Sequence, residues 1–246
     1  MSVETPEELK ALRAVGRVVA QAIREMRRRV RVGVSTAELD AIGAGIFRQA
    51  GARSGPRLDY GFPGTNCISV NDEAVHGVPG QRRLRRGDLV KLDVTAELDG
   101  FYADACVSVS VGPPQPAQSR LTAAADEGLA RGIRAARAGA PLNQIGAAVE
   151  QAVTERGFAI CADLMGHGIG RRIHEAPDVP NHYVPGLSRP LTAGLVITIE
   201  PIVSAGSGAV RQAGDGWTVR TLEGVLAAHT EHTIVITDGA AIILTI

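Results

Sequence analysis

The stretch KLDVTAELDGFYAD, residues 91–104, decides the fold of this chain. It reads as a β-hairpin, because the two-residue link Asp99-Gly100 is a strong tight-turn signal between two alternating segments. Two further acids in the stretch, Asp93 and Asp104, are not explained by the turn. The hairpin is therefore expected to carry two carboxylates at positions that otherwise belong to a packed sheet.

The register of the hairpin brings these two acids together. With Leu98 opposite Phe101 across the turn, Asp104 lies opposite Thr95. Asp93 is then its diagonal neighbour on the same face. Two carboxylates about 5 Å apart repel by about 3 kcal/mol at an effective dielectric of about 20. A positive partner is expected between them, and divalent cations fit better than arginines, which fall mainly in predicted helices and turns.

The chain repeats one pattern twice. Three pairs of segments match in the same order: 32–51 with 138–157, 84–94 with 191–201, and 104–112 with 231–239. Each half reads as two helices followed by antiparallel strands. Chance similarity between alanine-rich amphipathic helices would not preserve this order. We therefore expect one domain, 1–246, with pseudo-twofold symmetry, formed by internal duplication from halves of about 1–112 and 117–246.

The duplication adds two more acids to the hairpin pair. Glu200 occupies the position equivalent to Asp93, and Glu231 the position equivalent to Asp104. A solvated face or an ordinary ion pair would explain any one of them, but four in equivalent strand positions favour a shared site. His167, between two glycines, supplies an imidazole. Four carboxylates and one imidazole suit two divalent cations.

Helix signals precede the hairpin. Thr5-Pro6-Glu7-Glu8 reads as a capping box with proline at the first helical position, followed by an amphipathic segment that reaches Val30. Ser35 and Glu38 begin a second helix, which ends at Gly51. Helices and antiparallel strands together predict an α/β chain of the α+β type.

Composition limits the class of protein. The chain has 246 residues, of which 45% are hydrophobic, enough for the core of one large domain. Its 26 basic and 26 acidic residues balance, which argues against specific nucleic-acid binding and against an anionic membrane surface. Three scattered cysteines, no signal-peptide pattern and no apolar run of membrane-spanning length predict a cytoplasmic protein that does not enter a membrane.

These segments resemble the type I methionine aminopeptidases over nearly the whole chain. The most specific parts are the hairpin and the segments SVNDEAVHGVP (69–79), GHGIGRRIHEAP (166–177), ITIEP (197–201), DGWTV (215–219) and EHTIVITD (231–238). The resemblance implies the pita-bread fold, a curved antiparallel sheet backed by two helix pairs. It also implies removal of the initiator methionine from nascent proteins and peptides with a small second residue, by a metal-activated water or hydroxide that attacks the first peptide bond.

The resemblance implies a dinuclear site with two divalent ions, Co, Mn, Fe or Zn. Its ligands would be Asp93, Asp104, His167, Glu200 and Glu231, with Asp104 and Glu231 bridging. The catalytic residues would be His76, His174 and Glu200. His174 would contact the scissile carbonyl, His76 would lie near the scissile nitrogen, and Glu200 would also shuttle a proton.

The resemblance also implies a small apolar pocket for the methionine side chain. Its lining would comprise Cys67, Phe62, Ile173 and Trp217, with His76 and His174 at the reacting bond. Three positions depart from the common pattern of the family. Phe62 stands where tyrosine is common, Ile173 replaces a common phenylalanine, and His229-Thr230 replaces a glutamine and an aromatic residue. These departures bear on pocket width.

Four other interpretations compete with this one. The short interval between His174 and Glu200 leaves no room for the insertion of type II enzymes. Prolidases and aminopeptidase P share the acids but carry a long additional N-terminal domain. A non-catalytic binding protein of the same fold would lose ligands, and a phosphoesterase would need basic residues near the metals. The expected partners are nascent polypeptide N-termini, met in the region of the ribosome exit, and the expected state is a monomer.

Overall fold

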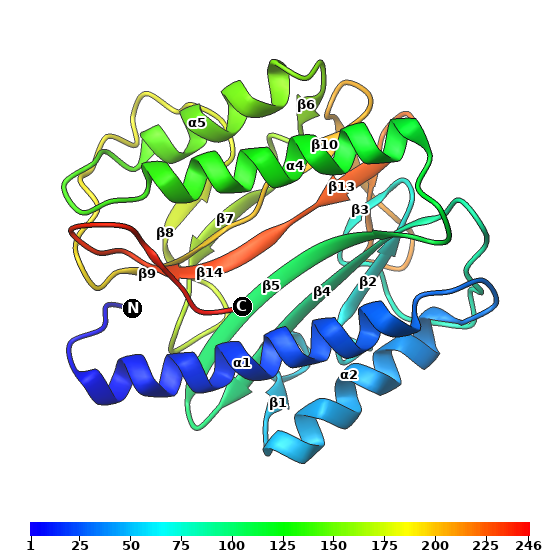
Figure 1. The fold of residues 1–246 in the computed structure, drawn as a ribbon, viewed down its shortest axis with the longest axis horizontal. Coiled ribbons are helices and arrows are strands. Elements are labelled where there is room, and N and C mark those ends of the chain that lie inside the picture. The colour runs from blue at the N-terminus through cyan, green and yellow to red at the C-terminus, as the bar shows by residue number, and fades with distance from the viewer.

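A nine-stranded antiparallel sheet forms the centre of the computed structural model, which describes residues 1–246 (Figure 1). Its strands are β1 (Arg53–Ser54), β2 (Cys67–Val70), β4 (Leu89–Leu98), β5 (Phe101–Ser110), β7 (Met165–Gly168), β8 (Glu175–Pro180), β9 (Val196–Ile199), β14 (Glu231–Val235) and β15 (Ile242–Ile243). Two three-stranded sheets comprise β6 (Ala159–Ile160), β10 (Ile202–Ser204) and β13 (Ala227–His229), and β3 (Glu73–Val75), β11 (Val210–Gln212) and β12 (Val219–Thr221).

Two pairs of long helices accompany the sheet. The helices are α1 (Pro6–Arg29), α2 (Thr36–Ala50), α3 (Gly55–Tyr60), α4 (Pro116–Ala135) and α5 (Asn143–Thr154). In Figure 1, α1 and α2 run along the half of the curved sheet that contains β4 and β5, and α4 and α5 along the half that contains β9 and β14. This is the predicted pita-bread arrangement of helix pairs and sheet. None of the helices combines the length and apolar character that crossing a bilayer requires.

The helices begin largely where the sequence predicts. Ser35 and Glu38 form a complete capping box at the start of α2, and Gly51 ends the helix in the left-handed conformation. At α1, the Thr5 side chain accepts the Glu8 amide at 3.2 Å. The predicted second half of that box is wrong. The Glu8 carboxylate accepts the amide of Glu4, which lies before the helix, instead of the Thr5 amide.

The hairpin has the predicted register. Leu98 is opposite Phe101, and Thr95 is opposite Asp104. Asp93 lies opposite Cys106, two positions along the same face. The register was predictable because a two-residue turn leaves no freedom in how the strands are paired.

The turn itself gains support from Glu97. Asp99 and Gly100 have φ values of 52° and 82°, the left-handed pair that a type I′ turn requires. The Glu97 carboxylate accepts the Gly100 amide at 2.7 Å and pairs with the guanidinium of Arg53 at 2.5 Å. Glu97 therefore stabilises the turn and is not part of the acid cluster.

Strand alternation separates the core from the cavity. Leu92 and Val94 of β4 are fully buried against α1 and α2, whereas Asp93 and Thr95 face the opposite side and line a cavity. Strand β9 repeats this, with Ile197 packed against α4 and α5. Each fully buried aliphatic side chain stabilises the folded state by about 1.5–3 kcal/mol. The two hydrophobic clusters, one beneath each helix pair, therefore hold the sheet from one face. The opposite face carries the polar residues of the cavity.

The two halves meet between β5 and β14. In the aligned segments 104–112 and 231–239, Ala105 corresponds to His232, and these two residues pair with each other across the strands. The sheet order β4-β5-β14-β9 therefore places the hairpin β4–β5 directly beside the strands β14 and β9. Asp93 and Asp104 of the hairpin lie in one cavity with Glu200 and Glu231.

Candidate metal centre and substrate cavity

One cavity of about 400 Å³ collects the residues predicted for the site. All of them line it: Phe62, Cys67, His76, Asp93, Asp104, His167, Ile173, His174, Glu200, Trp217 and Glu231. They come from segments spread over most of the chain. The structure therefore brings the predicted residues together in one cavity, while their chemical roles remain predictions.

Three of the four acids are almost completely buried. Asp104, Glu200 and Glu231 are 6%, 9% and 2% exposed. Thr95 donates to Asp104 Oδ2 at 2.7 Å, and Thr233 of β14 hydrogen-bonds the Asp104 backbone at both N–H and C=O. These contacts lock the two halves together at the acid cluster.

Burial raises the pKa of every acid in the cluster. The pKa of Asp104 rises to about 6 because of burial, against the hydrogen bonds from Thr95 and neighbouring groups that lower it. The pKa values of Asp93, Glu200 and Glu231 lie well above their ordinary values, first through burial and then through the charge of Asp104. No arginine or lysine pairs with any of the four, so their negative charge has no protein partner other than histidine.

The donor set fits divalent cations. Asp104 Oδ1 and Glu231 Oε1 are buried without any hydrogen-bond partner. Two overlapping groups, Asp104–His167–Glu231 and Glu200–His229–Glu231, each bring their ligand atoms within 4.8 Å of one another. Carboxylate oxygens and imidazole nitrogens are ordinary ligands of divalent metals, and a cation would satisfy both the orphaned oxygens and the excess charge.

His167 is held ready to act as a ligand. Its Nδ1 lies 2.9 Å from the Gly168 carbonyl oxygen, so this nitrogen carries the proton and Nε2 is left free, 3.5 Å from Glu200 Oε1. Thr198 fixes both partners, because its hydroxyl accepts the His167 amide at 3.0 Å and donates to Glu200 at 2.9 Å. Burial lowers the pKa of His167 to about 3, which keeps the ring neutral. Thr198 was not singled out from the sequence.

Two exposed histidines, His76 and His174, lie at the mouth of the cavity. Tyr60, at the end of α3, lies with its hydroxyl 2.6 Å from His174 Nδ1, and the ring of His174 stands edge-on to that of His167, 4.2 Å between centroids. Tyr60 was missed by sequence reasoning, although Ser54 and Gly61 mark the short helix that presents it. The contact fixes the orientation of His174 over the acids.

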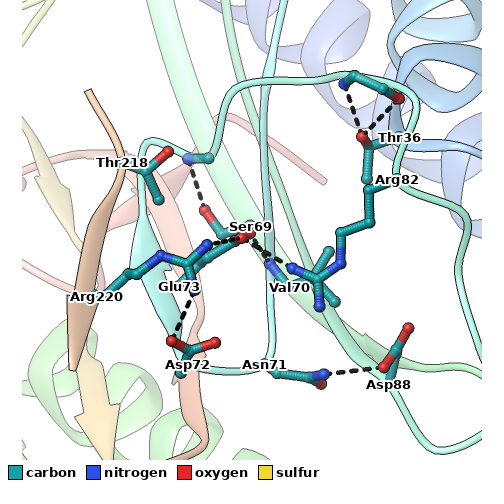
Figure 2. A network of polar contacts seen from close by, with 12 residues as sticks. Thr36, Ser69, Val70, Asn71, Asp72, Glu73, Arg82, Asp88, Thr218 and Arg220 are labelled. Atoms are coloured by element: carbon teal, nitrogen blue, oxygen red, sulfur yellow. Dashed lines mark hydrogen bonds and ion pairs between the residues drawn. The ribbon is translucent and has the colours of Figure 1, made fainter. Parts of the chain in front are cut away.

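His76 lies three residues after Glu73, which belongs to the polar network drawn in Figure 2. It has a φ of 56°, unusual for a residue with a side chain, so its loop has to be held from outside. Glu73 accepts the Val70 amide at 2.6 Å and ion-pairs with Arg82 and Arg220, at 2.9 and 2.7 Å. No role was predicted for this carboxylate, which links the segment of His76 to β12.

An apolar wall completes the cavity. The ring of Phe62 meets the indole of Trp217 edge-on at 5.3 Å between centroids. Phe62, Cys67 and Ile173 are 2%, 5% and 4% exposed, so the wall is well packed. The acids and the apolar wall therefore share one space large enough for a single side chain beside a reacting bond.

The chain matches the model of metallopeptidase family M24 over residues 10–238. It is 42% identical to methionine aminopeptidase 2 of Bacillus subtilis, covering 100% of this chain and 99% of that protein. It is 38% identical to the methionine aminopeptidase of Escherichia coli, covering 100% and 94%. The crystal structure of methionine aminopeptidase from Rickettsia prowazekii superimposes with a TM-score of 0.96 at 32% identity, covering both chains completely. A prolidase from Pyrococcus furiosus, 23% identical, shares the fold with a TM-score of 0.80 and extends beyond it, since the chain covers 65% of that protein.

Proposed function

The chain belongs to the type I methionine aminopeptidases of metallopeptidase family M24, and we propose that it removes the initiator methionine from nascent proteins and peptides with a small second residue. Membership in a metallopeptidase family implies a divalent metal ion. The observation that carries the proposal is the single cavity in which buried acids, two exposed histidines and an apolar wall adjoin one another.

The proposed centre holds two divalent ions, drawn from Co, Mn, Fe and Zn. Asp93, Asp104, His167, Glu200 and Glu231 would hold these ions, with Asp104 and Glu231 as the bridging residues shared between them. The orphaned oxygens of both bridging residues support this assignment, as does the place of Glu231 in both ligand groups. Divalent ions there would supply an activated water and polarise the carbonyl of the first peptide bond.

The side chains of the protein then transfer the protons and orient the substrate. Glu200 is proposed to accept the proton of the attacking water and to deliver it to the amine that leaves when the peptide bond breaks. Thr198 donates to one oxygen of this carboxylate and so fixes its orientation in the cluster. His174, oriented by Tyr60, is proposed to donate toward the carbonyl oxygen as it gains charge, and His76 to contact the scissile nitrogen.

The apolar wall is proposed to recognise the methionine side chain. An unbranched thioether fits between Phe62, Trp217, Cys67 and Ile173 without a polar partner. The cavity has a volume of about 400 Å³, and its acids and histidines adjoin the apolar wall; we propose that this crowded lining restricts the second residue to a small side chain.

We also propose how the enzyme is organised. The pairing of Ala105 with His232 supports an origin by internal duplication of a single catalytic domain. A nascent chain is the substrate, so the proposed place of action is the cytoplasm, in the region of the ribosome exit, and the proposed state is a monomer. Light scattering after size-exclusion chromatography and co-sedimentation with ribosomes test the last two points.

Peptide hydrolysis tests the proposed function. The protein is stripped with a chelator, each candidate metal is added back alone, and free methionine is measured from Met-Ala-Ser. Peptides that begin with leucine or proline are the matched controls. Metal-dependent release from the methionine peptide alone is expected, and the absence of any metal-dependent release of methionine would refute the proposal.

A further inference from the structure

His229 is a buried histidine without a hydrogen-bond partner. Its side chain is 2% exposed, and neither Nδ1 nor Nε2 finds a donor or an acceptor. Buried polar groups are nearly always paired, so two orphaned nitrogens in one ring call for an explanation. The ring belongs to the acid cavity, where it faces carboxylates instead of the apolar wall.

The position of the ring is fixed by its backbone. Strand β13 pairs His229 with Ile202. Ser108 accepts the His229 amide at 3.0 Å and donates to its carbonyl oxygen at 2.9 Å, and the thiol of Cys106 also lies against this oxygen. The backbone is therefore anchored to both β5 and β10, and the ring is presented to the acids by rigid elements.

The distances around His229 are close to those between ligands of one cation. Nε2 lies 3.7 Å from Glu200 Oε2 and 3.7 Å from Glu231 Oε2. This is too long for a hydrogen bond to either oxygen. Two ligands on one metal, each bonded at about 2.0–2.2 Å, stand roughly 3.0–3.5 Å apart, so a shift of a few tenths of an ångström closes the group.

We propose that His229 is an additional metal ligand, so that the centre carries two imidazoles, one from His167 and one from His229. This rests on the proposed function, because it extends the same metal centre. His229, Glu200 and Glu231 would form one ligand group, and Asp104, His167 and Glu231 the other. Each group then contributes one nitrogen, and Glu231 joins them.

A second imidazole changes which metals the centre prefers. Imidazole nitrogen suits zinc and later first-row metals, whereas all-oxygen sites suit manganese and magnesium. The preference for Co²⁺ and Zn²⁺ over Mn²⁺ should therefore depend on His229. An orienting residue that never touches the metal would not produce this difference between metals.

The test uses the full-length protein, stripped by chelation and titrated with Co²⁺, Zn²⁺ or Mn²⁺ alone. Loss of even an outer-shell partner costs about 10–100-fold in metal affinity, so His229→Gln is expected to lose at least about tenfold for Co²⁺ and Zn²⁺ and clearly less for Mn²⁺. The visible spectrum of bound Co²⁺ should change with it. His232→Gln is the matched control, because His232 bonds to Thr245 outside the acid cluster and should leave all three affinities unchanged.

X-ray absorption of the zinc-loaded wild type provides a readout that needs no variant. Two imidazoles per loaded centre are expected, and one imidazole would overturn the assignment even if His229→Gln fails to fold. Equal losses for all three metals, or none, would also overturn it. A wild-type protein that binds no metal would instead refute the proposed function, which separates the two failures.

Discussion

Replacing Asp104 with asparagine should stabilise the metal-free protein at neutral pH. Asp104 is buried, sits beside Asp93, and has a pKa of about 6 against an ordinary 3.8, with burial as the main cause. Between these pH values the folded state holds a proton that the unfolded chain has lost. The stability contributed by this proton is complete below about pH 4 and is lost as pH rises through about 6.

The size of the effect follows from the pKa difference. About two pH units at about 1.4 kcal/mol each give about 3 kcal/mol of lost stability for the metal-free wild type at pH 7.5. Asparagine at position 104 keeps the shape and can still accept the Thr95 hydroxyl, but it does not titrate. For a chain of this length, about 3 kcal/mol corresponds to about 6–12 °C in Tm.

Urea unfolding of stripped protein at pH 4 and pH 7.5 measures this difference. The two proteins should have similar free energies of unfolding at pH 4, and Asp104→Asn should be the more stable at pH 7.5. Saturating Co²⁺ should reverse the order, because the metal binds the folded wild type through a charged Asp104. If the difference between wild type and variant does not change from pH 4 to pH 7.5, Asp104 is not a carboxylate whose charge the fold opposes.

Three further substitutions test the site and its support. Glu200→Gln should lower kcat for Met-Ala-Ser by more than about 100-fold, since general acid–base catalysis alone contributes that much, and near-normal turnover would remove Glu200 from the mechanism. Tyr60→Phe deletes the 2.6 Å contact to His174, worth about 1 kcal/mol, so kcat/KM should fall about fivefold. A rate and pH profile identical to the wild type would contradict this orienting role. Glu73→Gln should lower the free energy of unfolding by about 1–3 kcal/mol in urea denaturation, because the two arginine side chains that pair with Glu73 are only about a third exposed. An unchanged free energy of unfolding would show that the network in Figure 2 is dispensable.

Much of the fold was predictable because local signals determined it. The Asp99-Gly100 turn set the hairpin register, and the caps at Ser35 and Gly51 set the bounds of α2. The short strands and α3 were not predicted, since segments of two to six residues have too little periodicity to be recognised. Their conformation is determined by neighbours that are distant in the sequence, such as Glu97 beside Arg53.

The acids were predictable for a different reason from the residues that support them. A buried carboxylate is costly, so Asp93 and Asp104 on the two paired strands of the hairpin already required a partner, and the repeat supplied two more acids at equivalent positions. Thr198 and Tyr60 carry no such cost in the sequence, because a hydroxyl is acceptable on a surface and in a core alike. Lys91, in the opening stretch itself, is fully buried and donates to the Asn71 carbonyl oxygen at 2.8 Å, a position that its sequence neighbours do not reveal. Charged residues that are costly to bury therefore allow a site to be predicted from the sequence. The groups that orient those charged residues can be identified only in the folded structure, where distant segments come within hydrogen-bond distance.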